Sequence, residues 1–186
     1  MSVPIRMRWG AAALLISLLA GVAWAGSLRD DYRAVVVQRQ QLEKQRSQYE
    51  VRIKEIKAEQ RKLTLALYKC VTQRSDPEWS ARLRAAQDRD RELEAERARL
   101  GDLRVSLDSA RADLEAQRAD IEEKYRGKPK GADYEGEFRS YMAALREDYF
   151  GRIESDLFSG YEAYIEGIEA HVDEIEAAVA ECREGL

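Results

Sequence analysis

A sevenfold repeat of apolar and aromatic residues runs through the first part of this chain and limits that part to a long helix. The repeat takes every seventh residue from 28 to 70 and consists of Leu28, Val35, Leu42, Tyr49, Ile56, Leu63 and Cys70. Side chains at this interval form a stripe along an α-helix that packs against the stripe of a neighbouring helix. The companion positions are half polar and include Arg39, Arg46 and Gln60. We interpret these three as solvated edges of the stripe or as residues that fix the register of the coiled coil.

Two breaks divide the chain into three helical segments. Asp76 followed by Pro77 is typical of a helix N-cap and the first residue of a helix. The stretch from 126 to 133 contains two glycines and a proline, which is typical of a turn. We therefore expect helices at about residues 27–74, 77–126 and 133–184, within a single helical domain that covers residues 26–186.

The second and third segments also carry apolar stripes, and the two stripes differ. The second carries a narrow stripe made of Trp79, Ala86, Leu93, Leu100, Leu107, Leu114 and Ile121. In the third segment the apolar positions follow one another in steps of four between 145 and 165, and such an excess of fours locally unwinds a left-handed supercoil. Long helices joined by short turns pack as antiparallel neighbours. The expected fold class is therefore all-α: a long antiparallel three-helix bundle, in other words a coiled-coil hairpin with a third helix.

The first 25 residues are typical of a signal peptide. Arg6 and Arg8 provide a basic start, an uncharged run covers residues 9–26, and residues 23–25 (Ala-Trp-Ala) have the small residues of a cleavage site. We predict cleavage after Ala25. The alternative is an uncleaved anchor in the inner membrane, because an uncharged run of 18 residues is just long enough to span a bilayer. In either case we expect the rest of the chain outside the cytoplasm, periplasmic or secreted.

The chain has two cysteines, Cys70 and Cys182, and thiols outside the cytoplasm tend to be oxidised. Cys70 precedes the break at Asp76 by six residues, and the descending and ascending stretches 77–126 and 133–182 have 50 residues each. Cys182 therefore returns to the end of the bundle where Cys70 lies, and both cysteines fall on an apolar stripe. We predict an internal Cys70–Cys182 disulfide. The alternative is a pair of intermolecular bridges in a parallel homodimer, which the same positions permit.

Charge is distributed unevenly along the chain. Residues 26–75 contain 12 basic and 6 acidic residues, whereas residues 133–186 contain 4 basic and 15 acidic residues. The first and third helices are therefore expected to attract each other, through solvated pairs worth only about 0–1 kcal/mol each. The net charge of the whole chain is −4. We expect no nucleic-acid partner, because such binding calls for a basic face.

Nothing in the sequence predicts an active site. His171 is the only histidine, and no spacing of His, Cys, Asp or Glu resembles a set of metal ligands. The sequence has no glycine-rich phosphate loop and no nucleophile elbow. We therefore expect a protein that is not an enzyme and that binds no metal or cofactor. His171 is expected at the edge of the apolar stripe, beside Val172.

Aromatic residues are concentrated between positions 134 and 164, where eight of 31 residues are Tyr or Phe. Four of these fall beside the apolar stripe and are the candidate interface residues: Tyr141, Phe150, Phe158 and Tyr164. Two interpretations remain open. These side chains either widen the core where the coil unwinds, or they form a partner-binding patch, since amphipathic aromatics are enriched at interfaces.

Together these features predict a noncatalytic cell-envelope protein that acts as a scaffold, spacer or partner-binding subunit. Its layout, a signal followed by long antiparallel helices, is similar to that of periplasmic holdase chaperones, which implies chaperone activity as an alternative. With a retained signal, the layout also resembles membrane-anchored phage tethers that carry a periplasmic coiled coil. A basic turn formed by Arg126, Lys128 and Lys130 would then face the membrane surface. The expected partner is an unidentified envelope protein, and a homodimer is also compatible with the pattern.

Overall fold

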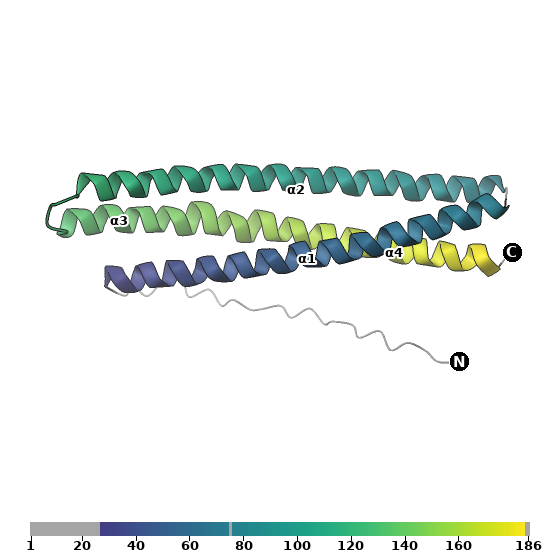
Figure 1. Ribbon diagram of the computed structural model, residues 1–186, viewed down its shortest axis with the longest axis horizontal. Helices are drawn as coiled ribbons and strands as arrows, with labels where there is room; N and C mark the ends of the chain where they lie inside the picture. The colour runs from purple at the N-terminus through teal and green to yellow at the C-terminus, as the bar shows by residue number, and fades with distance from the viewer. Residues whose placement is uncertain (1–26, 75, 185–186) are drawn as a thin grey trace, which may run out of the picture.

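The computed structural model describes residues 27–74 and 76–184, and every element within them is helical (Figure 1). The predicted signal peptide, residues 1–25, lies outside the described residues. The elements in chain order are α1 (Leu28–Arg74), α2 (Pro77–Lys124), α3 (Ala132–Ala144), the π-helical stretches η1 (Leu145–Phe150) and η2 (Ile153–Phe158), and α4 (Ser159–Glu184). The elements from α3 to α4 form one helical run.

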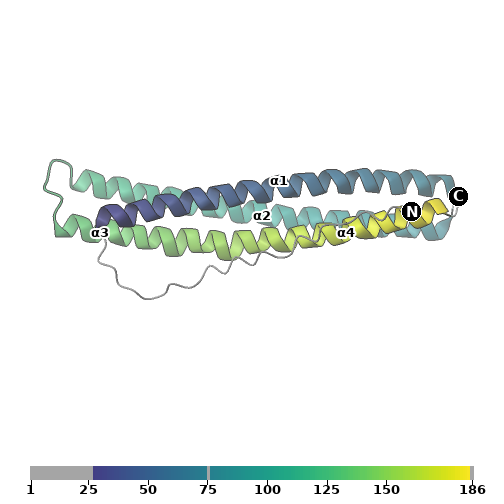
Figure 2. The same cartoon turned by 90° about the horizontal axis from the view of Figure 1, so that it is seen from below.

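Three long helical runs lie side by side and form a rod. α2 returns antiparallel to α1, and the run from α3 to α4 follows the direction of α1 (Figures 1 and 2). α2 has 48 residues, which corresponds to a length of about 70 Å at a rise of 1.5 Å per residue. The all-α, antiparallel three-helix fold is therefore confirmed. α1 begins at the end of the rod that carries the α2–α3 turn, and α4 finishes at the opposite end.

Local signals in the sequence set the helix ends. The Asp76 carboxylate accepts a hydrogen bond from the Glu78 backbone N–H at 2.9 Å, as expected of an N-cap before a proline. α2 ends at Lys124, slightly before the predicted end at residue 126, so Arg126 belongs to the turn. Gly127 follows with a φ of +71°, a left-handed conformation that favours glycine.

The π-helical stretches account for the apolar steps of four in the third run. An α-helix has 3.6 residues per turn, so side chains spaced four apart drift around its surface. The wider turn of a π-helix, with i→i+5 bonding, reduces this drift. Tyr149, Ile153 and Leu157 thereby stay on the inner face, where they are 6%, 8% and 2% exposed. The spacing in the sequence predicted an unwound supercoil here. In the structure the helix itself is wider, because it contains π-helical turns.

The interior contains two apolar clusters. The larger fills most of the rod and includes Val35, Leu42, Leu107 and most aromatic side chains of the third run. The smaller lies at the end where α1 and α4 finish, and it contains Leu67 and both cysteines.

Candidate functional site

A disulfide joins α1 to α4 inside the smaller apolar cluster. Cys70 and Cys182 have a Cα–Cα distance of 6.3 Å and are 112 residues apart in sequence. Their side chains are 5% and 0% exposed, and Leu67, Val71 and Val179 belong to the same cluster. The internal pairing predicted from the helix lengths is present in the structure. It closes the end of the rod opposite the α2–α3 turn (Figure 1).

Trp79, at the start of α2, packs into this closed end. Its ring is 7% exposed, and the guanidinium groups of Arg82 and Arg74 lie 4.5 and 5.3 Å from its centroid. Arg82 also donates from Nη1 to Glu181 Oε2 of α4 at 2.6 Å. The hydrogen bond to Glu181 is the main cause that raises the pKa of Arg82. These contacts hold α2 to the end that the disulfide already closes.

The four candidate interface residues lie in the core. Tyr141, Phe150, Phe158 and Tyr164 are 7%, 1%, 6% and 2% exposed. α1 and α2 both pack against the third run, and the Phe158 ring lies 5.2 Å from the Tyr49 ring of α1. The interpretation as a widened core therefore describes this structure. The alternative interpretation, an exposed partner-binding patch, does not fit this structure, because two neighbouring helices cover the broad aromatic face.

A buried polar layer crosses the rod near the boundary between the two apolar clusters. Gln60 of α1 and His171 of α4 are 6% and 2% exposed, and both contact the Asp90 carboxylate of α2. Gln60 Nε2 donates to Asp90 Oδ1, and His171 Nε2 lies 2.8 Å from the same oxygen. Thr64 donates from Oγ1 to Asp90 Oδ2 at 3.4 Å. All three helical runs therefore meet at Asp90.

The polar residues that interrupt the apolar stripe of α1 have different roles. Gln60 is buried because Asp90 supplies a partner for it, which fits a residue that fixes the register. Arg39 is exposed and pairs with Glu43 at 2.9 Å, so it is a solvated edge. His171 lies in the interior, and its prediction as an edge residue is wrong, because the sequence of α4 alone does not reveal the carboxylate opposite.

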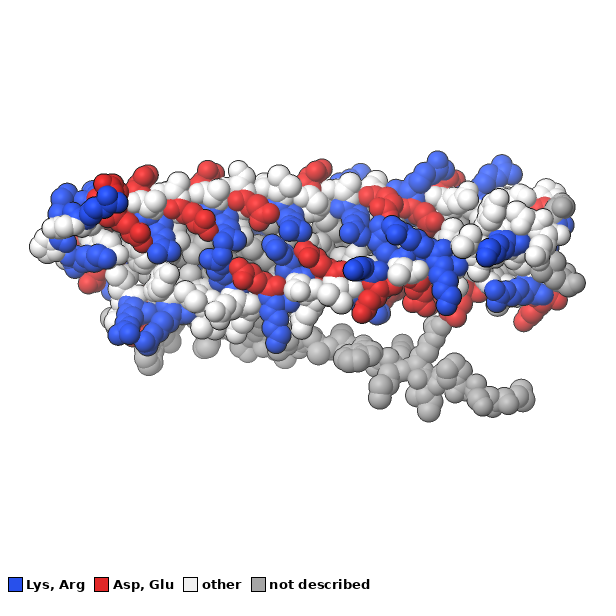
Figure 3. Space-filling view, in the orientation of Figure 1, with Lys and Arg blue, Asp and Glu red and all other residues white. Residues whose placement is uncertain are grey.

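A groove opens beside the polar layer, between α1 and α2, with side chains of α4 also lining it. We call it the α1–α2 groove. Its volume is about 690 Å³, within the range of small-molecule sites. Its polar and basic lining comprises Lys54, Lys57 and Arg61 of α1, Arg97 and Arg104 of α2, Glu50 of α1, and Tyr161 and Tyr164 of α4. Figure 3 shows Lys and Arg side chains gathered on the face where α1 and α2 lie side by side.

Only part of the positive charge in the groove is compensated. Lys57 is 7% exposed and bonds to Glu94, and Arg104 donates from Nη1 to Glu50 Oε1 at 3.1 Å. In the part of the chain that the structure describes, no ion pair forms at the other three cations of the lining, which are Lys54, Arg61 and Arg97. The groove is therefore strongly electropositive.

Two tyrosines border the groove from α4. Burial raises the pKa of both Tyr161 and Tyr164. Among the described residues, the Tyr164 hydroxyl has no hydrogen-bond partner of normal geometry. The Arg97 guanidinium nevertheless lies close enough to oppose part of the rise in the Tyr164 pKa. The groove could not be predicted from the sequence, because its lining comes from three helices whose alignment no single stripe reveals.

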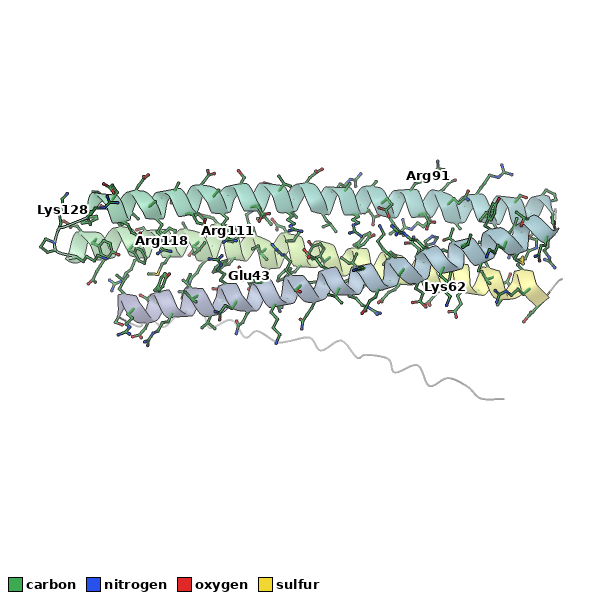
Figure 4. The ribbon with its side chains drawn as sticks, in the orientation of Figure 1. Glu43, Lys62, Arg91, Arg111, Arg118 and Lys128 are labelled. Carbon is green, nitrogen blue, oxygen red and sulfur yellow. A yellow bond between two sulfur atoms is a disulfide. The ribbon has the colours of Figure 1, made fainter. Side chains whose placement is uncertain are left out.

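The basic turn lies exposed at the other end of the rod. Arg126, Lys128 and Lys130 all belong to the α2–α3 connection, and Figure 4 shows Lys128 at its tip. Lys130 Nζ lies 4.8 Å from the centroid of the Tyr134 ring, and Arg126 pairs with Glu123. The turn is at the same end as the start of α1, which is the arrangement predicted from the sequence.

Residues 27–74 and 76–184 lack both a membrane-spanning helix and a metal-binding cluster. No helix in these ranges carries an apolar stretch long enough to cross a membrane. These ranges also hold no group of three or more His, Cys, Asp and Glu side chains that could bind a metal ion.

No known family model matches this chain, and no curated protein or solved structure is detectably similar to it. The function is therefore argued from the fold and the sites alone.

Proposed function

We propose that this protein is a noncatalytic component of the cell envelope, exported by its N-terminal segment, that acts as a rigid spacer or scaffold for a partner protein. The disulfide between Cys70 and Cys182 is the observation that supports this most directly. Disulfides form and persist mainly in oxidising compartments, which supports export, and this one fastens the last helix of the rod to the first.

The covalent bond gives one end of the rod a stiffness that surface ion pairs do not supply. A closed loop of 112 residues corresponds to about 4–5 kcal/mol of stabilisation in the chain-entropy account of disulfides. Single exposed pairs between α1 and α4, such as Arg52 with Glu169 at 2.6 Å, contribute about 0–1 kcal/mol each. The disulfide lowers the entropy of the unfolded chain, so it favours the folded rod in which the last helix is joined to the first.

The outward face of α1 is the surface we assign to the partner. Val37, Val51 and Leu65 are 51%, 53% and 53% exposed. They are 14 residues apart, two heptads, so they lie along one line of the helix. Tyr68 follows on the same helix and is 50% exposed. A helix of the partner with its own apolar stripe would cover this line.

Site-specific photo-crosslinking in the envelope tests this proposal. A photoreactive residue at Val51 or Leu65 is expected to capture a discrete partner band. The same residue at Arg91, which Figure 4 shows projecting away from the bundle, is expected to capture none. Solution X-ray scattering of the purified chain should show a rod of about 70 Å. A flexible or much shorter particle, or equal crosslinking at all three positions, would contradict the spacer.

A membrane tether is a second candidate, favoured by one observation. The start of α1 and the basic turn with Lys128 lie at the same end of the rod, so an anchor retained before α1 would bring the turn to the membrane surface. Anionic headgroups attract such residues by about 1 kcal/mol per charge. Recovery of the full-length chain in the membrane fraction would support this candidate. Recovery of only the cleaved chain would exclude it.

The holdase alternative requires an apolar cradle in the free protein. The exposed apolar side chains of α1 instead form a narrow line, which supports a helix-binding surface better than a cradle. Suppression of aggregation of an unfolded client by the purified protein would favour the holdase. If Val51→Ser/Leu65→Ser abolished that suppression, the α1 line would be the surface responsible.

A further inference from the structure

The α1–α2 groove combines a concave shape with basic residues from two neighbouring helices. Elsewhere the basic residues of α2 pair mainly within their own helix, as Arg111 does with Glu115 at 2.8 Å and Arg118 with Glu122 at 2.9 Å. In the groove, Lys54, Arg61 and Arg97 have no ion-pair partner among the described residues. Positive charge left uncompensated in a concave site attracts anions, because low-dielectric walls focus the field.

The register of the helices brings these cations to the two facing walls. Lys57 bonds to Glu94, and Glu50 bonds to Arg104, so α1 and α2 run past each other with Lys54 near the level of Arg97. Lys54 and Arg61 are two helical turns apart on one wall, about 10 Å at the α-helical rise. The groove thus presents charge from both sides and along its length.

Two uncharged residues, Tyr164 and Gly101, also line the groove. Tyr164 is 2% exposed, yet its hydroxyl lacks a hydrogen-bond partner of normal geometry within the described residues. Gly101 sits inside α2, where glycine is unfavourable, and a Cβ built there meets no atom within 4 Å. The missing Cβ at Gly101 leaves room for a ligand at the α2 wall, and the Tyr164 hydroxyl lies close to the Arg97 guanidinium of the same groove.

We propose that the α1–α2 groove binds a small anion with two phosphate groups, held by Lys54, Arg61 and Arg97 with Tyr164 as a further hydrogen-bond donor. Arginine forks match the oxygens of phosphate, and each phosphate carries about −1.5 to −2 charge, so two phosphates suit the three cations of the lining that have no ion-pair partner among the described residues. The ligand is either a free diphosphate compound or a lipid headgroup with two phosphates. The proposal does not depend on the spacer function.

Calorimetric titration of the purified chain with pyrophosphate tests the site. Arg97→Gln and Arg61→Gln are each expected to weaken binding roughly tenfold, the usual effect of losing a charged hydrogen bond. Tyr164→Phe should weaken binding, because it removes the hydroxyl that lies beside Arg97. Gly101→Leu should block the groove without removing a charge. The matched control is Arg126→Gln/Lys128→Gln/Lys130→Gln, which removes three cations from the turn and should leave the affinity unchanged.

Competing anions and lipids complete the test. Monophosphate and citrate should bind at least tenfold more weakly than pyrophosphate. Flotation with vesicles of phosphatidylcholine and cardiolipin that is lost in Arg97→Gln would identify a headgroup as the source, and pyrophosphate binding without flotation would identify a free ligand. Equal loss of pyrophosphate affinity in the groove and turn variants, unchanged binding in Gly101→Leu, or citrate binding as tight as that of pyrophosphate would overturn the proposal.

Discussion

His171 Nε2 of α4 lies 2.8 Å from Asp90 Oδ1 of α2, and Gln60 of α1 donates to the same carboxylate oxygen. One carboxylate therefore ties together three helical runs in the interior of the rod. Apolar stripes slide past one another at little cost when they move by a whole heptad, but such a slide would leave these polar groups buried and unpaired. We infer that the polar layer fixes the register that the disulfide then locks.

Asp90→Ala tests the polar layer. The change leaves Gln60 and His171 buried without their partner, so we expect the free energy of unfolding to fall by about 3 kcal/mol. Urea unfolding followed by circular dichroism measures this. Asp88→Ala is the matched control, because the exposed Asp88 pairs only with Arg91 on the same helix among the described residues, and its effect should stay within about 0.5 kcal/mol. Equal effects of the two changes would show that the layer contributes no stability.

Phe150→Ser tests the assignment of the aromatic residues to the core. Phe150 is 1% exposed, and the loss of a buried ring costs about 3–5 kcal/mol. The melting temperature should fall strongly, while Val105→Ser, at a side chain that is 69% exposed, should leave it nearly unchanged. A Phe150→Ser protein with normal stability would return the aromatic stretch to the role of an exposed interface.

Some features of the structure could be predicted from the sequence and others could not. The heptads and the Asp76–Pro77 break predicted the helices, and the equal helix lengths predicted the disulfide between Cys70 and Cys182. These features are local, or they follow from counting along straight helices. The burial of Gln60 and His171 could not be predicted in the same way, because each depends on a carboxylate that another helix supplies. The α1–α2 groove escaped prediction for the same reason.

The steps of four in the third run predicted part of the observed structure. The spacing showed that a regular coiled coil must change near residues 145–165. It did not decide between an unwound supercoil and a wider helix, because both bring side chains four apart onto one face. The structure has π-helical turns here, and Tyr149, Phe150 and Phe158 lie buried within them.

Two glycines of the rod should respond differently to substitution. A Cβ at Gly160 would lie 2.5 Å from Leu100 Cδ2, whereas a Cβ at Gly101 meets nothing within 4 Å. Gly101→Ala should therefore stabilise the protein by about 1 kcal/mol through helix propensity. Gly160→Ala should gain less, because the Leu100 side chain must rotate away. Chemical unfolding of both variants measures the difference, and a larger gain at Gly160 would contradict the close approach of α4 to α2.

Tyr49 should make stability depend on alkaline pH. Its hydroxyl donates to Glu162 Oε1 at 2.5 Å, and burial together with this carboxylate raises the Tyr49 pKa from 10.0 to about 12. Between pH 10 and about 12 the folded protein therefore keeps the Tyr49 hydroxyl proton, whereas the unfolded chain loses it. The stabilisation is fully present below pH 10 and declines as the pH rises towards 12.

Comparison of unfolding free energies across this pH range for the wild type and Tyr49→Phe checks the assignment. The variant should lose part of the alkaline decline, since it lacks the ionising group. Tyr125, Tyr141, Tyr161 and Tyr164, whose pKa values burial also raises, should contribute to the remainder. An identical decline in both proteins would remove Tyr49 as a cause.

The intact mass of the protein recovered from the envelope of cells that produce it, before and after reduction, tests the central claim most directly. The account predicts a monomer that begins at Gly26 and is about 2 Da lighter before reduction, because two hydrogens leave when a disulfide forms. That result would establish export and the internal Cys70–Cys182 bond in one experiment. A reducible covalent dimer, or a chain recovered with both thiols free, would contradict an exported rod that is closed by its own disulfide.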